Sequence, residues 1–138
     1  MKWRDIPDYV GHYQVSDSGE VRSLPRAVTD SNQWGAYTRN VRGRVLKQQM
    51  VVSPSGVRYA KVSLSIDGEV HQWLVHRLVA VAFLPNPEGK LEVNHKDGDP
   101  LHNDVANLEW STHKENLHHA ISTGLWDPRN RSKHARIN

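Results

Sequence analysis

The chain of 138 residues contains no cysteine, only one phenylalanine and no long apolar run. Without cysteine there can be neither a disulfide nor a thiolate zinc site, so any metal would have to be held by His, Asn, Asp or Glu. No apolar segment approaches the roughly 18 residues that a membrane helix needs, and the start of the chain has no apolar segment typical of a secretion signal. We therefore expect a soluble cytoplasmic protein with no membrane partner.

The length predicts one compact domain, or one small domain with an appendage. Hydrophobic residues make up only 37% of the chain. A core of that size is small, which favours help from a bound ion. Two large domains are excluded.

Positive charge is unevenly distributed, although the net charge is only +3. Residues 21–66 contain eight basic residues against one acid, Asp30. Residues 67–127 are acidic on balance, and the tail from 128 is basic again. A basic segment is often only a solvated surface, but so strong a bias favours contact with phosphate groups and release of their counterions. The basic segment therefore predicts a polyanionic partner that presents phosphate groups.

Two β-hairpins are predicted from alternating apolar residues around turn sequences. The first covers residues 12–24 with its turn at residues 17–19, and the second covers residues 58–75 with an Asp-Gly turn at 67–68. Between them, residues 30–40 are interpreted as a mobile loop, and residues 41–49 as a further strand. Trp34 and Tyr37 in that loop could stack on nucleobases, but such aromatic residues more often cover a small core.

A short core helix is predicted for residues 76–84, with Leu78, Val81 and Ala82 on its buried face and with Pro85 and Pro87 ending it. From residue 91 onward, the sequence pattern predicts a strand, a long turn, a second strand and a helix. Thr112 and Glu115 form a capping box at the start of this second helix. Leu117, Ala120 and Ile121 form its apolar stripe, and Gly124 is its C-cap. These elements predict an α+β fold.

A strand–turn–strand–helix unit brings the end of its first strand beside the first turns of its helix. Here that juxtaposes Asn94 and His95 with Asn116. Their oxygen atoms suit a hard divalent ion, Mg²⁺ or Mn²⁺, between Asn94 and Asn116. His95 would face outward to a water molecule and act as a general base, while Asn107 braces the loop.

The carboxylates of Asp97 and Asp99 also look like metal ligands, but turns favour aspartate for its own hydrogen bonds. A calcium loop starting at Asp97 would need glycine where His102 stands and glutamate where Leu108 stands. Asp97 and Asp99 are therefore interpreted as turn formers. His118, on the predicted helix, is interpreted as exposed.

Residues 76–120, "HRLVAVAFLPNPEGKLEVNHKDGDPLHNDVANLEWSTHKENLHHA", resemble the HNH endonucleases of the phage and intron homing type. These enzymes have the ββα-metal (His-Me finger) fold. The preceding segment "WRDIPDYVGHYQVSDSGEVRSLPR" resembles the NUMOD-type motif that often accompanies them. Together the two resemblances cover residues 3–124, and they imply a bacterial or phage-infected cell as the setting.

The resemblance implies a role for each matching position. His95 corresponds to the general base, and Asn94 to a metal ligand that is often aspartate. Asn116 corresponds to the second metal ligand, and Asn107 to the central asparagine that fixes the loop and orients the histidine. With asparagine at 94, neither ligand is charged, so weak affinity for the ion is expected until DNA phosphate completes the site.

The predicted organisation is a basic β-rich NUMOD-type module in residues 1–50, a nuclease core in 51–125 with its ββα-metal unit at about 91–124, and a basic tail in 126–138. The expected DNA contacts are Arg22, Arg26, Arg39, Arg42, Arg44, Lys47, Arg77 and His119. For Arg77 solvation is an equal alternative, and His119 could simply pack.

The expected activity is metal-dependent hydrolysis of phosphodiester bonds in DNA with one ion per site, as nicking or double-strand cleavage. The main alternative is a DNA-binding module without catalytic activity, and a weaker one is an enzyme or binding protein directed at RNA. A homodimer is also considered, because one active site makes one nick and a double-strand break needs two sites or two visits.

Overall fold

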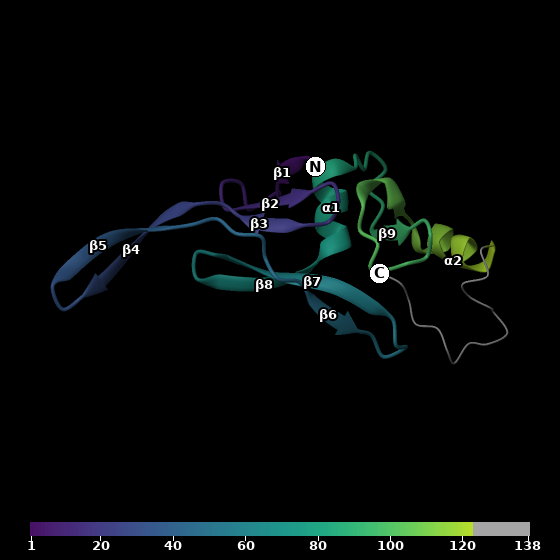
Figure 1. Ribbon diagram of the computed structural model, residues 1–138. Helices are drawn as coiled ribbons and strands as arrows, with labels where there is room; N and C mark the ends of the chain where they lie inside the picture. The colour runs from purple at the N-terminus through teal and green to yellow at the C-terminus, as the bar shows by residue number, and fades with distance from the viewer. Residues whose placement is uncertain (123–138) are drawn as a thin grey trace.

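The computed structural model describes residues 1–122 and has an α+β architecture, as predicted (Figure 1). The predicted cap Gly124, Trp126, the tail 126–138 and the side chains of His118, Ala120 and Ile121 lie outside the described part. In chain order the elements are β1 (Trp3–Asp5), β2 (Tyr13–Ser16), β3 (Val21–Ser23), β4 (Arg26–Asn32), β5 (Gly35–Val41), β6 (Gln49–Val52), β7 (Arg58–Ile66), β8 (Glu69–Leu74), α1 (Val75–Phe83), β9 (Glu92–His95), the short 3₁₀ helix η1 (Val105–Asn107), β10 (Leu108–Ser111) and α2 (His113–Ser122).

The strands form four small antiparallel sheets, ordered β1-β2-β3, β4-β5, β6-β7-β8 and β10-β9. The first predicted hairpin is confirmed as β2–β3, in which Val15 pairs with Val21 and both are fully buried. Its turn is closed by Ser16, whose hydroxyl oxygen accepts hydrogen bonds from the backbone N–H groups of Ser18 and Glu20. The turn therefore has a fixed shape, which becomes important for the site below.

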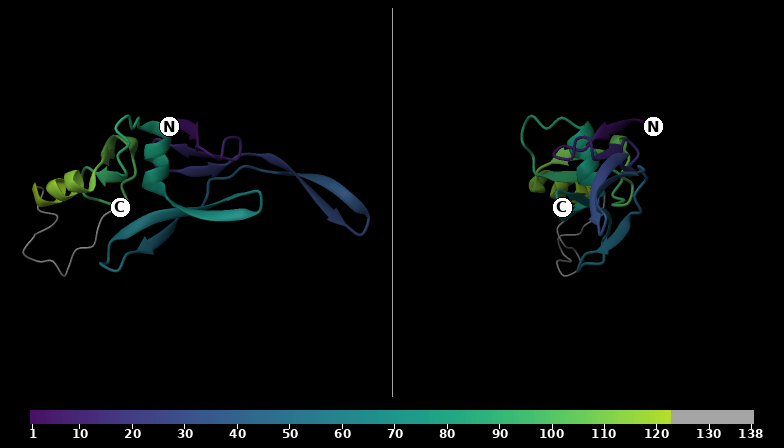
Figure 2. Two further views of the ribbon diagram at one scale, coloured as in Figure 1. Left: turned by 180° about the vertical axis from the view of Figure 1, so that it is seen from behind. Right: turned by 90° about the vertical axis from the view of Figure 1, so that its left-hand side faces the viewer.

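The mobile loop predicted for residues 30–40 is wrong, because β4 and β5 pair along their whole length from Arg26↔Val41 to Asn32↔Gly35. They form a two-stranded ribbon that projects from the body of the molecule, and we call residues 26–41 the β-arm (Figures 1 and 2). Trp34 lies in its end turn with 85% of its surface exposed. The strand predicted for residues 41–49 is also absent: Val45 makes only an isolated bridge to Arg22, and β6 begins at Gln49.

The second predicted hairpin is confirmed as β7–β8. Asp67 and Gly68 in its turn have φ of 51° and 80°. Positive φ at both central positions is what a two-residue turn of the type favoured between twisted strands requires, and Asp-Gly supplies it at little cost. Tyr59, Val62 and Leu64 are buried beneath this sheet.

Helix α1 is confirmed, but its predicted buried face is partly wrong. Val81 is 46% exposed, whereas Val75, Leu78 and Val79 are buried. Apart from His76 and Arg77, the seven other residues of α1 are all apolar, so polarity alone does not predict which side of the helix faces the core. No helix within residues 1–122 is long and apolar enough to cross a membrane.

One hydrophobic cluster joins the N-terminal and C-terminal parts of the chain. It contains Val15 and Val21 of the first hairpin together with Val62, Val79 and Leu108 from later elements. Each such aliphatic side chain contributes about 1.5–3 kcal/mol when fully buried. Hydrogen bonds cross the same boundary, because the backbone N–H of Ser65 donates to the hydroxyl of Tyr13 at 3.0 Å. The predicted border near residue 50 therefore does not coincide with a break in packing.

Candidate active site

Strands β9 and β10 form a short ribbon with two chemically different faces. The register pairs Asn94 with Glu109 and His95 with Leu108. Since side chains alternate along a strand, Glu92, Asn94, Glu109 and Ser111 share one face, while Val93, His95, Leu108 and Trp110 share the other. Helix α2 contributes Asn116 to the first face, and helix α1 contributes His76 to the second.

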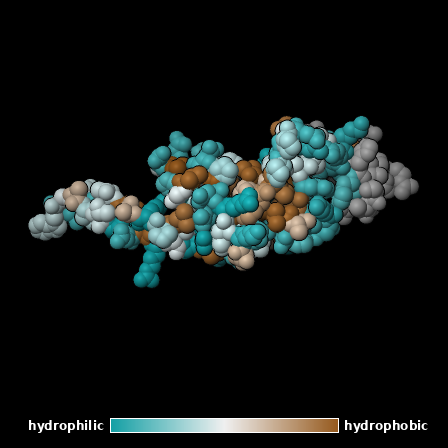
Figure 3. All heavy atoms as spheres, turned by 90° about the horizontal axis from the view of Figure 1, so that it is seen from above, coloured by the Kyte–Doolittle hydropathy of each residue, from teal (hydrophilic) through white to brown (hydrophobic). Residues whose placement is uncertain are grey.

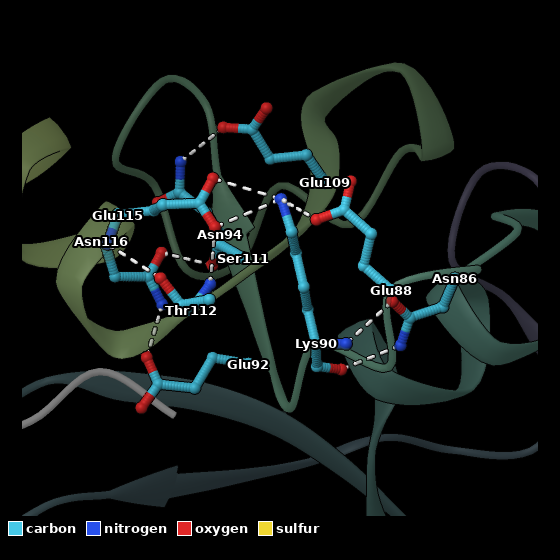
Figure 4. A network of polar contacts seen from close by, with 10 residues as sticks. All are labelled: Asn86, Glu88, Lys90, Glu92, Asn94, Glu109, Ser111, Thr112, Glu115 and Asn116. Atoms are coloured by element: carbon cyan, nitrogen blue, oxygen red, sulfur yellow. Dashed lines mark hydrogen bonds and ion pairs between the residues drawn. The ribbon is translucent and has the colours of Figure 1, made fainter.

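The face toward α2 is a network of amide and carboxylate groups (Figure 4). The Asn94 amide nitrogen donates to Glu109 at 2.8 Å, and the Asn116 amide nitrogen donates to Glu92 at 2.7 Å. The hydroxyl of Ser111 donates to the side-chain amide oxygen of Asn116 at 2.8 Å. Both asparagines are buried. The two predicted metal ligands therefore lie on the same side of the ribbon, each beside a carboxylate.

The start of α2 is fixed by the predicted capping box, which is confirmed. The Thr112 backbone N–H donates to the Glu115 carboxylate at 3.0 Å, and the Glu115 backbone N–H donates to the Thr112 hydroxyl at 3.1 Å. Lys90 reaches this helix start from the segment before β9 and places its ammonium 3.1 Å from Glu115 (Figure 4). Its hydrogen bond to Glu115 raises the pKa of Lys90. These contacts hold the helix turn that carries Asn116.

The donor atoms on this face suit a hard divalent ion. Asn94 and Asn116 offer amide oxygens, and Glu92 and Glu109 offer carboxylates, all of which are ligands that Mg²⁺ and Mn²⁺ accept. Within residues 1–122 no group of three or more His, Cys, Asp or Glu residues is arranged to hold a metal, so the amide oxygens would be required. The sequence analysis missed both carboxylates. Strand alternation could have found Glu92, which is two residues before Asn94.

His95 lies at the end of β9 on the opposite face, and it does not point outward as predicted. Its side chain is only 4% exposed. Its Nε2 lies 2.8 Å from the Asn103 amide oxygen, and its Nδ1 is buried with no hydrogen-bond partner among residues 1–122. The His95 and His76 rings pack edge to face with centroids 4.9 Å apart. The difference arises because residues 96–104 fold back over the ring instead of leaving it open.

Burial is the main influence on the charge of His95. It lowers the pKa of the imidazole, and the hydrogen bond with Asn103 and the nearby Asp97 and Asp99 carboxylates oppose this only in part. The neutral ring is therefore the favoured form near neutral pH. A neutral imidazole has one nitrogen able to accept a proton, which is what a general base needs.

Asn107 is buried and spans the loop between β9 and β10. Its carbonyl oxygen accepts from the backbone N–H of Asp97 at 3.1 Å, and its amide nitrogen donates to the Asp97 carboxylate and to the His102 carbonyl oxygen, each at 2.9 Å. Three hydrogen bonds from one side chain hold both ends of the loop. The resemblance implied that Asn107 fixes this loop, and these hydrogen bonds are consistent with that role.

Asp97 and Asp99 form the turn, as interpreted from the sequence. The backbone N–H of Asp99 donates to the Asp97 carboxylate, and that of Leu101 donates to the Asp99 carboxylate. The ring of His102 lies 2.6 Å from the other Asp97 oxygen. This hydrogen bond is the largest influence that lowers the pKa of Asp97 to about 2.

The predicted DNA contacts fall into two groups. Arg26, Arg42, Arg44 and Lys47 are exposed on or beside the base of the β-arm. In the view from above, the arm itself is drawn mostly in pale shades, and strongly hydrophilic residues gather toward the body (Figure 3). These four cations are accessible to a large partner.

The other predicted contacts already have protein partners or are partly buried. Arg22 donates to the Gln14 side chain at 2.6 Å and lies over the Trp3 ring. Arg77 donates to a backbone carbonyl oxygen at 2.9 Å, and Arg39 pairs with Asp30. His119 is half-buried on α2.

Comparison with known families agrees with this geometry. Residues 1–51 match the model of the NUMOD4 motif, and residues 74–118 match that of the HNH endonucleases. The second match includes α1, the β9–β10 ribbon and the first turns of α2. The described fold is thus an HNH-type α+β fold preceded by a NUMOD4 motif, which confirms the resemblance recognised in the sequence.

Individual relatives match most of the length of this chain. The chain is 37% identical over 124 residues to DNA endonuclease I-HmuI of Bacillus phage SP01, covering 90% of this chain and 60% of that protein. It is 35% identical to an uncharacterized HNH endonuclease, L245, of Acanthamoeba polyphaga mimivirus, covering 90% of this chain and 31% of that protein. A solved structure described as DNA binding and cleavage by the HNH homing endonuclease I-HmuI superposes with a TM-score of 0.70 at 34% identity, covering 96% of this chain and 65% of that one. The chain therefore spans less than two thirds of each of these relatives.

Proposed function

We propose that this chain is a DNA endonuclease that hydrolyses phosphodiester bonds in double-stranded DNA. The observation that carries the proposal is His95, a buried imidazole at the end of β9 within the segment that matches the HNH endonucleases, where burial lowers its pKa. The opposite face of the same ribbon presents Asn94, and α2 places Asn116 on that face, so a base and two oxygen ligands lie on the two faces of one short ribbon.

In the proposed reaction, His95 takes a proton from a water molecule while the oxygen of that water forms a bond to the scissile phosphorus. The bond between phosphorus and the leaving sugar oxygen breaks in the same displacement, and that oxygen takes a proton from solvent. Asn107 keeps the loop closed around the histidine. HNH nucleases typically use a divalent metal ion, and we assign its ligands here to Asn94 and Asn116, with Mg²⁺ or Mn²⁺ preferred. When bound, such an ion supplies positive charge that stabilises the phosphate and the leaving oxygen.

The DNA partner is supported by the exposed cations at the base of the β-arm. Arg26, Arg42, Arg44 and Lys47 are all exposed, so phosphates can reach them. The remaining proposed contacts are Arg22, Arg39, Arg77 and His119. The first three of these would have to exchange a protein partner for a phosphate, and this lowers their net contribution to binding.

The test is cleavage of supercoiled plasmid DNA with Mg²⁺ or Mn²⁺ and with EDTA. His95→Ala should lower the cleavage rate by about 10²–10⁴-fold, the usual effect of losing a general base, while the dissociation constant for DNA stays nearly unchanged. His102→Ala, in the same loop but exposed, serves as the matched control and should cleave normally. Cleavage by His95→Ala at the wild-type rate would show that the base is another residue. The nicked and linear products separate, so the same gels report single-strand or double-strand cutting.

A second function, DNA binding without cleavage, is favoured by one feature of the site. His95 is 4% exposed with Nε2 already in a hydrogen bond, and the amides of Asn94 and Asn116 are bonded to carboxylates. Retained binding with no metal-dependent cutting at any pH would support this function. Competition between duplex DNA and RNA in the same binding assay would test the RNA alternative.

A further inference from the structure

Asn103 is a buried residue in the β9–β10 loop that the proposed mechanism has not used. Only 6% of its surface is exposed, and its amide oxygen lies 2.8 Å from Nε2 of His95. A carbonyl oxygen accepts hydrogen bonds but cannot donate them, so this contact requires the proton of the neutral ring to be on Nε2. The lone pair is then on Nδ1, which is the nitrogen that lacks a partner within the described residues.

The orientation of the ring is fixed from a second side by His76 of α1. That residue is fully buried, and its ring meets the His95 ring at 65° with the centroids 4.9 Å apart. The His95 side chain therefore lies between an imidazole that limits its rotation and an amide that selects its tautomer. Leaving a buried nitrogen without a hydrogen bond is costly, so such an atom in a native protein requires an explanation, and a catalytic role is one.

Asn103 is itself held in place by the N-terminal hairpin. A Cβ atom added at Gly19, whose φ is +89°, would lie 2.9 Å from the Asn103 Cβ and 3.0 Å from its carbonyl oxygen. Two residues beyond Asn103, the backbone N–H of Val105 donates to the Asp17 carbonyl oxygen at 2.8 Å. The turn at residues 17–19 belongs to the segment that matches the NUMOD4 motif, so that motif is packed directly against the loop of the HNH segment.

We propose that Asn103 is the positioning residue of His95, which holds the ring with Nε2 protonated and Nδ1 as the proton-accepting atom. The turn at residues 17–19 holds Asn103 in that position. The NUMOD4 segment thus supports the catalytic histidine as well as carrying cations for DNA. This inference rests on the proposed nuclease function for its kinetic consequence, but the tautomer of His95 can be measured without cleavage.

The first experiment uses two variants. In Asn103→Leu a side chain of similar size lacks the acceptor oxygen, whereas Asn103→Asp keeps an oxygen that can accept the hydrogen bond. The ring nitrogens of His95 are observed by NMR in protein labelled with ¹⁵N-histidine, and kcat and KM are measured on plasmid DNA. Asn103→Leu should convert one tautomer into a mixture and lower kcat by about 10–100-fold, as expected when the group orienting an active-site residue is lost, with KM unchanged. Asn103→Asp should keep the wild-type tautomer and most of kcat, and His102→Ala should behave as wild type in both measurements.

The second experiment tests the support from the N-terminal hairpin. Gly19→Ala should lower kcat without changing KM, because the added methyl group must displace Asn103. Gly11→Ala is the matched control, since Gly11 has a similar φ of +83° but nothing within 4 Å of an added Cβ. It introduces comparable backbone strain without the contact, so only the difference between the two variants measures the effect on Asn103. Equal kcat values for the two variants would show that the hairpin does not position Asn103.

Several results would overturn the assignment of Asn103. If Asn103→Leu is folded and keeps both the wild-type tautomer and kcat, Asn103 does not position the ring. If it cleaves faster than wild type, Asn103 covers the base instead of orienting it. Should Asn103→Leu fail to fold, Asn103→Ala carries the same two measurements. If the wild-type protein does not cleave at all, the nuclease proposal fails, and the NMR comparison still decides whether Asn103 sets the tautomer.

Discussion

The β-arm and the β9–β10 ribbon are both two-stranded and antiparallel, but their surroundings differ completely. No residue of β4 or β5 is buried, and the arm projects from the body (Figure 1). In β9, by contrast, Val93, Asn94 and His95 are all buried, with α1 on one face and α2 on the other. The same backbone arrangement thus serves two purposes: one ribbon leaves its side chains in water, and the other fixes them.

This difference predicts how each ribbon responds to mutation. An exposed side chain on the β-arm has few protein contacts to lose, so its replacement should change DNA binding more than folding. A buried polar side chain in the other ribbon or in the loop that joins its strands satisfies groups that would otherwise be unpaired away from water, so its replacement should change folding and cleavage together. The predictions below test this contrast.

Asn107→Ala should have the largest effect. It removes three hydrogen bonds and leaves the Asp97 backbone N–H without its partner, which should lower the free energy of unfolding by about 2–4 kcal/mol. Urea unfolding measures this change, and plasmid cleavage should be lost in the same variant. Asn40→Ala, an exposed asparagine on the β-arm, is the control and should change stability by less than about 0.5 kcal/mol. Equal losses in the two variants would contradict the contrast between the ribbons.

A triple replacement of Arg42, Arg44 and Lys47 by alanine should have a smaller effect, on binding only. Each phosphate contact contributes about 0.9 to the slope of log K against log salt concentration. The slope should therefore become shallower by about 2–3 units, with the urea midpoint unchanged. Lys2→Ala, an exposed cation outside the basic segment, should leave the slope as it is. An unchanged slope in the triple variant would place the DNA surface elsewhere.

The same contrast explains what the sequence could predict. The hairpin of β7 and β8 was predictable because Asp67-Gly68 supplies the required turn and one face is buried. The β-arm was missed because its strands are in water on both sides, so Ala27, Thr29 and Thr38 occupy strand positions without producing an apolar alternation. Strand prediction depends on a buried face, and this ribbon has none.

Within the site, local motifs were predictable and long-range contacts were not. The Thr112–Glu115 capping box lies within four residues, so spacing alone predicts it. The burial of Asn103 was not predicted, because it involves contact with Gly19, which lies 84 positions earlier in the chain. The inward orientation of His95 likewise depends on contacts with His76 and with Asn103 of the β9–β10 loop. Neither contact can be predicted from the residues next to His95 in the sequence.

The smallest predicted effect concerns the exposed pair of His102 and Asp97 in the loop. The hydrogen bond with Asp97 raises the pKa of His102, so its contribution to stability is complete below the unfolded value of about 6.5 and is lost as pH rises through the raised folded value. The pKa of Asp97 is lowered to about 2, so its contribution is present above the unfolded value of about 3.9 and is lost as pH falls. The pair should therefore stabilise the loop most between about pH 4 and pH 6.5.

Thermal unfolding of the wild type and of His102→Ala from pH 4 to pH 9 measures this contribution. The wild type should have the higher melting temperature near pH 5–6, and the difference should disappear toward pH 9. The effect should be modest, because an exposed ion pair is screened by solvent. A difference of the same size at pH 5 and pH 9 would mean that the His102 side chain stabilises the loop by packing and not by its charge. In that case the loop that covers His95 would be held by Asn107 and the N-terminal turn, without help from the charge of the His102–Asp97 pair.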